Sequence, residues 1–592
     1  MGGYLALTLL VGVAAARRAS RNTNEYFLSG RHMPWWLLGT SMVATTFSTD
    51  TPNLVTDIVR QNGVAGNWVW WAFLLTGMLT VFVYAQLWRR AGVMTDLEFY
   101  ELRYSGRTAS FLRAFRAIYL GLFFNVMIMA TVSLAAMKIA GVLLGLSPLG
   151  TIVVAGGITA AFTMVGGLLG VLLTDFLLFI IAMMGSVAAA VFAVSHPAVG
   201  GLGRLLANPQ VAERLSMLPN FGDTSQLVAL LIVPLAVQWW SVWYPGSEPG
   251  GGGYIAQRML AARSETDATG ATLVFNVAHY ALRPWPWILV ALASLIVFPT
   301  VDSLRLAFPH LPPALLGHDL AYPAMLTFLP AGLLGFVVAS LAAAYMSTIS
   351  THLNWGASYI VHDFWRRFVH PRASERELVN IGRITTVILL LLAAVVALWL
   401  QNALQAFGIL LQIGAGTGLL FILRWFWWRI NAVSELTAMA VSFVVAVYLE
   451  RFHASLWPQL PLSGTAKLVI GVAITTVAWV GATLVTRPAD ERTLRSFYAL
   501  TRPGGPGWAR VVRNAAADGE PLETTGRGWI VPTGIIAMVA GCFTVYCALF
   551  GIGYWIYGRY ALAALLTAVA AAGAIYLART WGRLSGDAAV AA

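Results

Sequence analysis

The stretch Gly39-Thr40-Ser41-Met42-Val43-Ala44-Thr45-Thr46-Phe47-Ser48-Thr49-Asp50-Thr51-Pro52 lies inside a long apolar run, residues 34–58. It carries hydroxyl side chains, a carboxylate and a proline where a membrane helix usually carries aliphatic residues. Because proline lacks a backbone N–H and disfavours helix in the residue before it, we expect the backbone to unwind here. Carbonyl oxygens freed at membrane depth are tolerated only where they line a cavity or bind something. The stretch therefore predicts a broken membrane helix beside a binding site.

The composition of the whole chain supports a membrane location. Of 592 residues, 58% are hydrophobic and only 10% are charged, whereas a soluble domain carries about 25% charged residues. The net charge of +12 comes from arginines in short segments between apolar runs, which indicates membrane topology rather than a nucleic-acid partner. We therefore expect the lipid bilayer to be the surroundings of most of the chain.

About fifteen apolar runs are long enough to cross a bilayer as helices. The first, residues 4–16, lacks the pattern of a cleaved signal peptide and is predicted to be a spanning helix. The others are residues 34–58, 66–88, 116–143, 148–166, 168–195, 226–246, 270–299, 322–352, 380–400, 404–424, 434–450, 466–485, 530–552 and 559–578. The fold class predicted is an all-α integral membrane protein.

Arginine-rich connections alternate with arginine-poor ones, which sets the predicted orientation. The basic set is residues 17–31, 89–116, 258–263, 366–383, 424–429 and 487–527. With this set in the cytoplasm of a cell (inner) membrane protein, the N-terminus lies outside and the C-terminus inside. Residues 197–225 carry Arg204 and Arg214 but must then face outward.

A second polar segment lies at residues 342–351, where Ala344, Ser347 and Thr348 share one helix face. Such small residues also let membrane helices pack closely, but their oxygens are the ligands that a hard cation prefers. Asp175 lies in an apolar helix, where a carboxylate is costly and usually functional. A structural hydrogen bond is the alternative for Asp175.

A third feature is the break at residues 244–253, Tyr-Pro-Gly-Ser-Glu-Pro-Gly-Gly-Gly-Gly, inside a Trp-rich helix. Paired interruptions in the two halves of a transporter indicate a binding site at the membrane midplane. This break lies five helices after the break near Pro52, which fits a five-plus-five inverted repeat with broken first and sixth core helices. The predicted units are residues 1–33 (leading helix and loop), 34–200 and 201–425 (the two repeats), 426–486 (two more helices), 487–528 (a cytoplasmic linker) and 529–592 (a C-terminal hairpin and tail).

From about residue 20 to 485 the chain resembles the sodium/solute symporter family, whose members carry sugars, amino acids, carboxylates and vitamins. The motifs that carry the resemblance are Tyr26-Phe27-Leu28-Ser29-Gly30-Arg31, Met164-Val165-Gly166-Gly167 with Thr174-Asp175, Tyr254-Ile255-Ala256-Gln257-Arg258, and Ala343-Ala344-Tyr345-Met346-Ser347-Thr348 with Asn354. The resemblance implies a sodium ion bound by the carbonyls of Ala44, Phe47 and Ala344 and the hydroxyls of Ser347 and Thr348. Some members hold a second sodium ion, whose ligands correspond to Asp175, Ser347, Ser350 and Thr351.

The sequence departs from the family at Thr46, often Asp or Asn in members, at residues 250–253, where sugar carriers tend to place amides, and at Trp70, where some place an acid. A typical sugar pocket is therefore not expected. We expect the solute cavity to be lined by Thr46, Asp50, Thr51, Trp70, Trp239, Trp243 and Tyr254. Hydroxyls with tryptophans suit a sugar or polyol, while a carboxylate, an amino acid or an amine stay open as solutes.

Other classes of function are less consistent with the sequence. A membrane-embedded enzyme would need a nucleophile–base pair or metal cluster, yet the histidines form no HxxxH or HExxH pattern. The one unusual pair, His279 with Arg283, is interpreted as a polar contact within the bundle. The sequence lacks the GxxxxGK[ST] loop that is typical of an ATP-driven pump. It also lacks a large soluble module of the kind that a sensor carries. The prediction is a sodium-coupled symporter that is not an enzyme, with a proton-coupled carrier as the alternative.

Overall fold

The computed structural model describes residues 10–12, 14–17, 19–241, 248–400, 411, 413–414, 416–522 and 529–584. Within these ranges the chain is helical, apart from turns and one isolated bridge between Met33 and Ala262. Ten helical stretches are long and apolar enough to span a membrane: Val64–Ala91, Gly106–Leu144, Gly166–Ser195, Glu265–Val297, Ala331–Val369, Glu375–Trp399, Ala432–Leu456, Gly464–Val485, Val531–Ile556 and Tyr560–Gly582. The all-α membrane class is thus confirmed.

The count of about fifteen spans stays a prediction. Runs 34–58, 148–166 and 226–246 are broken or shorter in the structure, where the last two contain the apolar helices Pro148–Met164 and Thr224–Ala236. Runs 4–16 and 404–424 fall largely outside the described residues. The boundary between runs 148–166 and 168–195 is real, because Gly167 interrupts α12 (Gly157–Ser195) with φ 55° and ψ −161°, a conformation that favours glycine.

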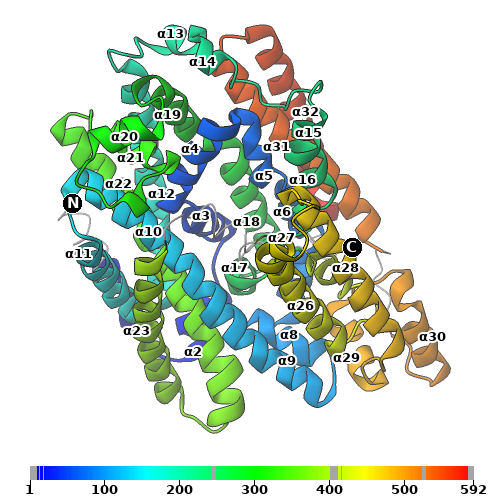
Figure 1. The fold of residues 1–592 in the computed structure, drawn as a ribbon. Coiled ribbons are helices and arrows are strands. Elements are labelled where there is room, and N and C mark those ends of the chain that lie inside the picture. The colour runs from blue at the N-terminus through cyan, green and yellow to red at the C-terminus, as the bar shows by residue number, and fades with distance from the viewer. Residues whose placement is uncertain are drawn as a thin grey trace.

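The break near Pro52 is present. The first half, α3 (Trp35–Thr46), ends where Phe47 leaves helical geometry at φ −88° and ψ 78°, and the second half, α4 (Asp50–Asn62), begins three residues later. Pro52 stands in the first turn of α4, where a helix needs no internal partner for a backbone N–H. Figure 1 shows α3 near the middle of the molecule with α4, α10 (Asn125–Leu144), α17 (Gly253–Ala261) and α18 (Glu265–Val277) around it.

The second break lies between η8 (Gln238–Trp240) and α17. Residues 242–247 fall outside the described part. Residues 248–251 form a turn closed by a 2.8 Å hydrogen bond from the N–H of Gly251 to the carbonyl of Glu248, with Gly250 at φ +86° and Gly251 at φ +82°. Two long helices pack across α3 from the other side: α12 and α22 (Ala331–Ser358). These elements bring both interruptions and both polar segments to the centre of the bundle.

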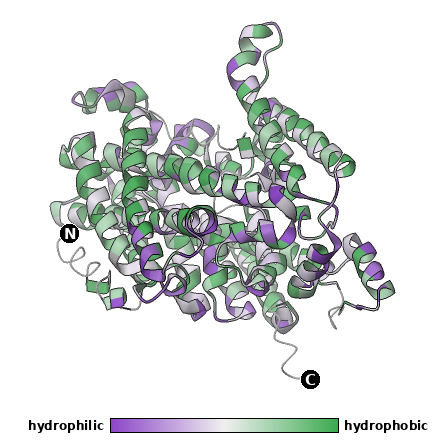
Figure 2. Cartoon of the chain, turned by 90° about the horizontal axis from the view of Figure 1, so that it is seen from below, coloured by the Kyte–Doolittle hydropathy of each residue, from purple (hydrophilic) through white to green (hydrophobic). Residues whose placement is uncertain are grey.

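The remaining helices surround this centre. α31 (Val531–Ile556) packs on α6 (Leu74–Leu79), whereas α32 (Tyr560–Leu584) packs mainly on α31. Apolar residues run along most of the helices, and hydrophilic residues gather in connections and short peripheral helices (Figure 2). The outer and connecting elements are α2 (Thr23–Leu28), α7 (Ala85–Ala91), α8 (Phe99–Arg103), α9 (Gly106–Ile118), α13 (Leu202–Ala207), α14 (Pro209–Ala212), α19 (Pro284–Val297), α20 (Val301–Ala307), α21 (Ala321–Leu326), α23 (Glu375–Trp399), α25 (Gly418–Leu423), α26 (Ala432–Val447) and α28 (Gly464–Val485).

The predicted linker, residues 487–528, contains two helices, α29 (Glu491–Thr501) and α30 (Ala509–Ala517). Phe497 and Trp508 are fully buried and stack with ring centroids 5.6 Å apart. The Trp508 Nε1 donates to the carbonyl of Trp425 at 2.9 Å. The helices of this segment are therefore packed against the membrane core.

Candidate functional site

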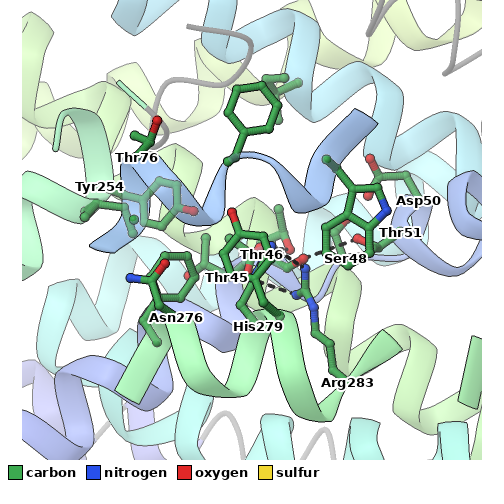
Figure 3. A pocket seen from close by; sticks show the side chains of 18 of the residues that line it. Thr45, Thr46, Ser48, Asp50, Thr51, Thr76, Tyr254, Asn276, His279 and Arg283 are labelled. Atoms are coloured by element: carbon green, nitrogen blue, oxygen red, sulfur yellow. Dashed lines mark hydrogen bonds between the residues drawn. The ribbon is translucent and has the colours of Figure 1, made fainter. Parts of the chain in front are cut away.

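A cavity of about 130 Å³ opens at the break between α3 and α4 (Figure 3). Its polar lining comes from both halves of the broken helix and from the stretch α18–η9, where η9 (Ala278–Leu282) is a π-helical turn. Such turns in membrane helices are frequent at functional sites. The lining residues are Thr45, Thr46, Ser48, Asp50, Thr51, Leu54, Val55, Trp70, Phe73, Thr76, Gly77, Thr80, Ile128, Thr131, Val132, Glu248, Gly251, Tyr254, Ile255, Thr272, Phe275, Asn276, His279, Tyr280, Arg283 and Thr348.

Thr46, the last residue of α3, is held by the facing helix. Its Oγ1 lies 3.0 Å from Nδ1 of His279 and accepts a hydrogen bond of 3.0 Å from Nη1 of Arg283. The same hydroxyl donates back to the carbonyl of Val43 at 2.9 Å. The pair that the sequence suggested as a bundle contact therefore lines the cavity.

Asp50, the first residue of α4, places a carboxylate in the cavity wall. Its carboxylate and the hydroxyl of Ser48 are buried next to each other. Thr51 is fixed by a 3.2 Å hydrogen bond from its Oγ1 to the carbonyl of Thr46. Polar groups in the wall of a cavity fix the orientation of a ligand, so this end of the cavity is suited to a polar solute.

The predicted aromatic lining is present in part. Trp70 and Tyr254 line the cavity, and Trp70 stacks on Tyr280 with centroids 5.9 Å apart. Trp239 is not among the described residues that line the cavity. Its ring packs against Trp240, and its carbonyl accepts a hydrogen bond from Thr76. Trp243 lies outside the described residues.

The predicted sodium ligands converge where the end of α3 meets the middle of α22. Thr348 Oγ1 donates to the carbonyl of Thr45 at 2.7 Å and lies 3.2 Å from that of Ala344. The backbone N–H of Phe47 donates to the carbonyl of Ala44 at 3.1 Å. The five residues Ala44, Phe47, Ala344, Ser347 and Thr348 are all buried, and the hydroxyl of Ser347 bonds Asp175, so the sodium site stays a prediction.

Asp175 of α12 is fully buried next to the same turn of α22. Its Oδ1 accepts from Ser347 at 2.6 Å and its Oδ2 accepts from Ser41 at 2.5 Å. Ser350 bonds the carbonyl of Ser347 at 3.1 Å rather than the carboxylate. Asp175 and Ser347 are thus in direct contact, whereas the hydrogen bond of Ser350 stays within α22.

Arg258 of α17 is an addition that the sequence did not suggest. Its Nη2 lies 3.9 Å from Oδ2 of Asp175 and donates to Thr351 Oγ1 at 2.8 Å. Both Arg258 and Asp175 are 0% exposed. A guanidinium therefore already compensates the carboxylate, at the place where a second sodium ion would bind.

Glu248 is a second cavity residue that sequence reasoning missed. It lines the cavity, yet its two carboxylate oxygens are bound by Arg424 at 2.7 Å and by Arg116 at 2.8 Å. All three side chains are nearly fully buried. The second break is thereby tied to α9 and to the residue after α25. The only sequence signal was an acid within a glycine-rich break.

Comparison with known proteins agrees with this arrangement. The model of the "Sodium:solute symporter family" matches residues 26–442. A sodium/glucose cotransporter of Vibrio parahaemolyticus is 26% identical over 464 residues, which cover 76% of this chain and 83% of that protein. A sodium/myo-inositol cotransporter 2 of Mus musculus is 26% identical over 480 residues, covering 75% and 68%.

A solved structure of a Na+-coupled sialic acid symporter superposes with a TM-score of 0.63 at 21% identity, covering 82% of this chain and 97% of that one. This likeness concerns the fold, whereas the family match spans most of the chain. The family and these relatives are membrane transporters rather than enzymes. The chain belongs to the sodium:solute symporter family.

Proposed function

We propose that this protein is a sodium-coupled symporter that imports a small polar organic solute by alternating access. The observation that carries the proposal is the position of Thr348, which lines the solute cavity and also belongs to the oxygen set at the end of α3. An ion at that set would touch both halves of the core, α3 and α22. Ion binding and solute binding are then coupled through one turn of helix.

The proposed sodium ligands are the carbonyls of Ala44, Phe47 and Ala344 with the hydroxyls of Ser347 and Thr348. Neutral carbonyl and hydroxyl oxygens suit a hard monovalent cation. Asp175, Ser347, Ser350 and Thr351 are proposed as a second sodium site. The contact between Arg258 and Asp175 means that this second ion must share the carboxylate with, or displace, the guanidinium.

The proposed solute site is the cavity at the α3–α4 break, with Thr46, Asp50, Thr51, Trp70 and Tyr254 in its wall. Hydroxyl and carboxylate groups would bond solute hydroxyls, and the aromatic rings would pack on apolar faces of a sugar ring. The relatives named as glucose and myo-inositol cotransporters favour a sugar or polyol. The proposed location is the cell membrane, with the N-terminus outside and the C-terminus in the cytoplasm.

The test is solute exchange in proteoliposomes that contain the full-length protein. With a labelled panel of sugars, polyols, sugar acids and amino acids inside and outside, we expect exchange of at least one solute in sodium buffer and none in choline or potassium buffer. Uptake of equal rate in sodium-free medium under a proton gradient would instead establish a proton-coupled carrier. Absence of exchange for every solute under both gradients would contradict a carrier function.

A further inference from the structure

The solute cavity contains a positive charge at a fixed position. Arg283 lines the cavity wall and is only 2% exposed. Its guanidinium is packed 5.3 Å above the ring of Trp287, and it reaches Thr46 and His279 on the cavity side (Figure 3). An arginine inside a membrane protein is costly and usually marks a substrate or ion pathway.

The hydrogen bonds around this guanidinium all run in one direction. Arginine only donates, so Nε2 of His279, 3.2 Å from Nη2 of Arg283, must be the acceptor. The ring is then neutral with its proton on Nδ1, which donates to Thr46 Oγ1. Thr46 in turn donates to the carbonyl of Val43. His279 and Thr46 therefore act as positioning residues that hold the guanidinium against the end of α3.

The charges of the cavity are distributed unevenly. Glu248 is held by Arg116 and Arg424, so its charge is compensated within its own network. Asp50 stands at the N-terminus of α4, where a helix stabilises a carboxylate. Arg283 faces the C-terminal end of α3, across the break, and its charge also acts on the Asp50 carboxylate. A solute in the cavity thus meets a guanidinium near Thr46 and a hydrogen-bond acceptor at Asp50.

We propose that the transported solute carries a carboxylate that binds Arg283. The guanidinium fork matches a carboxylate in geometry and charge better than it matches a neutral hydroxyl. The rest of the cavity, with Asp50, Thr51 and Asn276 beside Tyr254 and Tyr280, suits a hydroxylated carbon skeleton, as in a sugar acid. This inference rests on the proposed function and narrows its solute class from sugars and polyols to carboxylates.

The first experiment compares matched acid and neutral solutes on the purified full-length protein in sodium buffer. The pairs are glucuronate with glucose, galacturonate with galactose, and gluconate with sorbitol, and the amino acids serine and proline form a further arm. We expect the carboxylates to raise the unfolding temperature at concentrations at least tenfold below those of their neutral partners. A response to the amino acids alone would support the carboxylate and identify an amino-acid skeleton. Equal or stronger stabilisation by the neutral partners, or no response to any acid, would overturn the inference.

The second experiment changes the guanidinium. Arg283→Gln should weaken binding of the responding acid by roughly tenfold to a hundredfold, as for the loss of a hydrogen bond to a charged group. Arg283→Lys should lose less, since it keeps the charge without the fork. Arg305→Gln serves as the control, because Arg305 is exposed and pairs with Asp302 on α20. Unchanged acid affinity in a folded Arg283→Gln protein would overturn the inference.

Failure of this inference can be told apart from failure of the proposed function. Sodium-dependent exchange of neutral sugars, with acids inactive, would support the symporter proposal and refute the inference that the solute carries a carboxylate. Binding of acids with equal affinity in sodium and in choline buffer would support the carboxylate inference and refute sodium coupling. The inference also requires that Arg283→Gln alter the acid-to-neutral selectivity, which a purely structural arginine would not change.

Discussion

At the scale of single residues, Thr348 lies between the two proposed binding regions. Its Oγ1 reaches the carbonyl of Thr45 at 2.7 Å across the α3–α22 contact, and the residue also lines the solute cavity. The hydroxyl donates its hydrogen to that carbonyl and keeps its lone pairs, so it can bind an ion without losing the hydrogen bond. The residue would therefore contact both proposed sites.

Thr348→Ala removes one oxygen from the proposed sodium site. We expect the apparent sodium constant for uptake to rise about tenfold, since loss of one polar contact costs roughly 1 kcal/mol or more. Sodium titration of solute uptake in proteoliposomes measures it. Thr386→Ala is the matched control, because Thr386 is equally buried but bonds only its own helix, at Gly382. An equal shift in the control would show that the effect is one of packing.

Asp50→Asn tests the solute end of the cavity. We expect solute affinity to fall by about tenfold, because the amide is a weaker acceptor for hydroxyls than the carboxylate. Sodium binding, measured by the sodium dependence of thermal stability, should stay within a factor of two of the parent. Asp57→Asn is the control on the same helix, since Asp57 is buried outside the cavity and bonded to Gln61. The reverse pattern, with sodium binding lost and solute binding kept, would move Asp50 to the ion path.

At the scale of elements, the break between α3 and α4 was predictable because its cause is local. Pro52 and the hydroxyl run stand within a few residues of the interruption at Phe47. The partners of the buried charges were not predictable in this way. Arg116 and Glu248 are 132 residues apart, and Arg283 and Thr46 are 237 apart. Periodicity and composition identify which helices are polar, but they do not say which of the many helices face one another.

The packing of α12, α17 and α22 leads to a prediction about stoichiometry. If a second sodium ion binds at Asp175, Ser350 and Thr351, two sodium ions should enter per solute, each adding about 2.3 kcal/mol per 100 mV of membrane potential. The measurement is the ratio of labelled sodium to labelled solute entering proteoliposomes, which does not depend on the charge of the solute. We expect a ratio of two, falling to one in Asp175→Asn.

The control for this prediction is Asp302→Asn, which removes an exposed carboxylate on α20. A sodium-to-solute ratio of one in the parent and in Asp175→Asn, with equal sodium affinity in both, would contradict a second sodium site. Arg258, 3.9 Å from Asp175, would then be the permanent partner of that carboxylate. In that case its role is to link α17 to α12 at the core of the bundle.

At the scale of the whole molecule, the connections separate onto two faces. The arginine-rich segments contact one another: Arg89 bonds the carbonyl of Ala262 at 2.7 Å, Arg367 pairs with Glu101 at 2.9 Å, and Arg103 bonds the carbonyl of Arg424 at 3.0 Å. On another face, the backbone N–H of Val64 bonds the carbonyl of Arg214 at 2.9 Å. Residues 197–225 therefore lie with the arginine-poor connection 59–67, despite their two arginines.

This separation supports the proposed orientation and permits a direct test of it. Gly203 of α13 is exposed, with open space around an added Cβ, and Ala516 of α30 is exposed on the arginine-rich side. In a background where Cys542 and Cys547 are replaced by Ala, Gly203→Cys should react with a membrane-impermeant maleimide on intact cells. Ala516→Cys should react only after permeabilisation, because α30 lies within the basic segment 487–527 that the positive-inside rule keeps in the cytoplasm. Labelling of Ala516→Cys on intact cells with protection of Gly203→Cys would invert the orientation. The parent without cysteines gives the background, and sodium-dependent uptake by each variant shows that the labelled protein is the folded carrier.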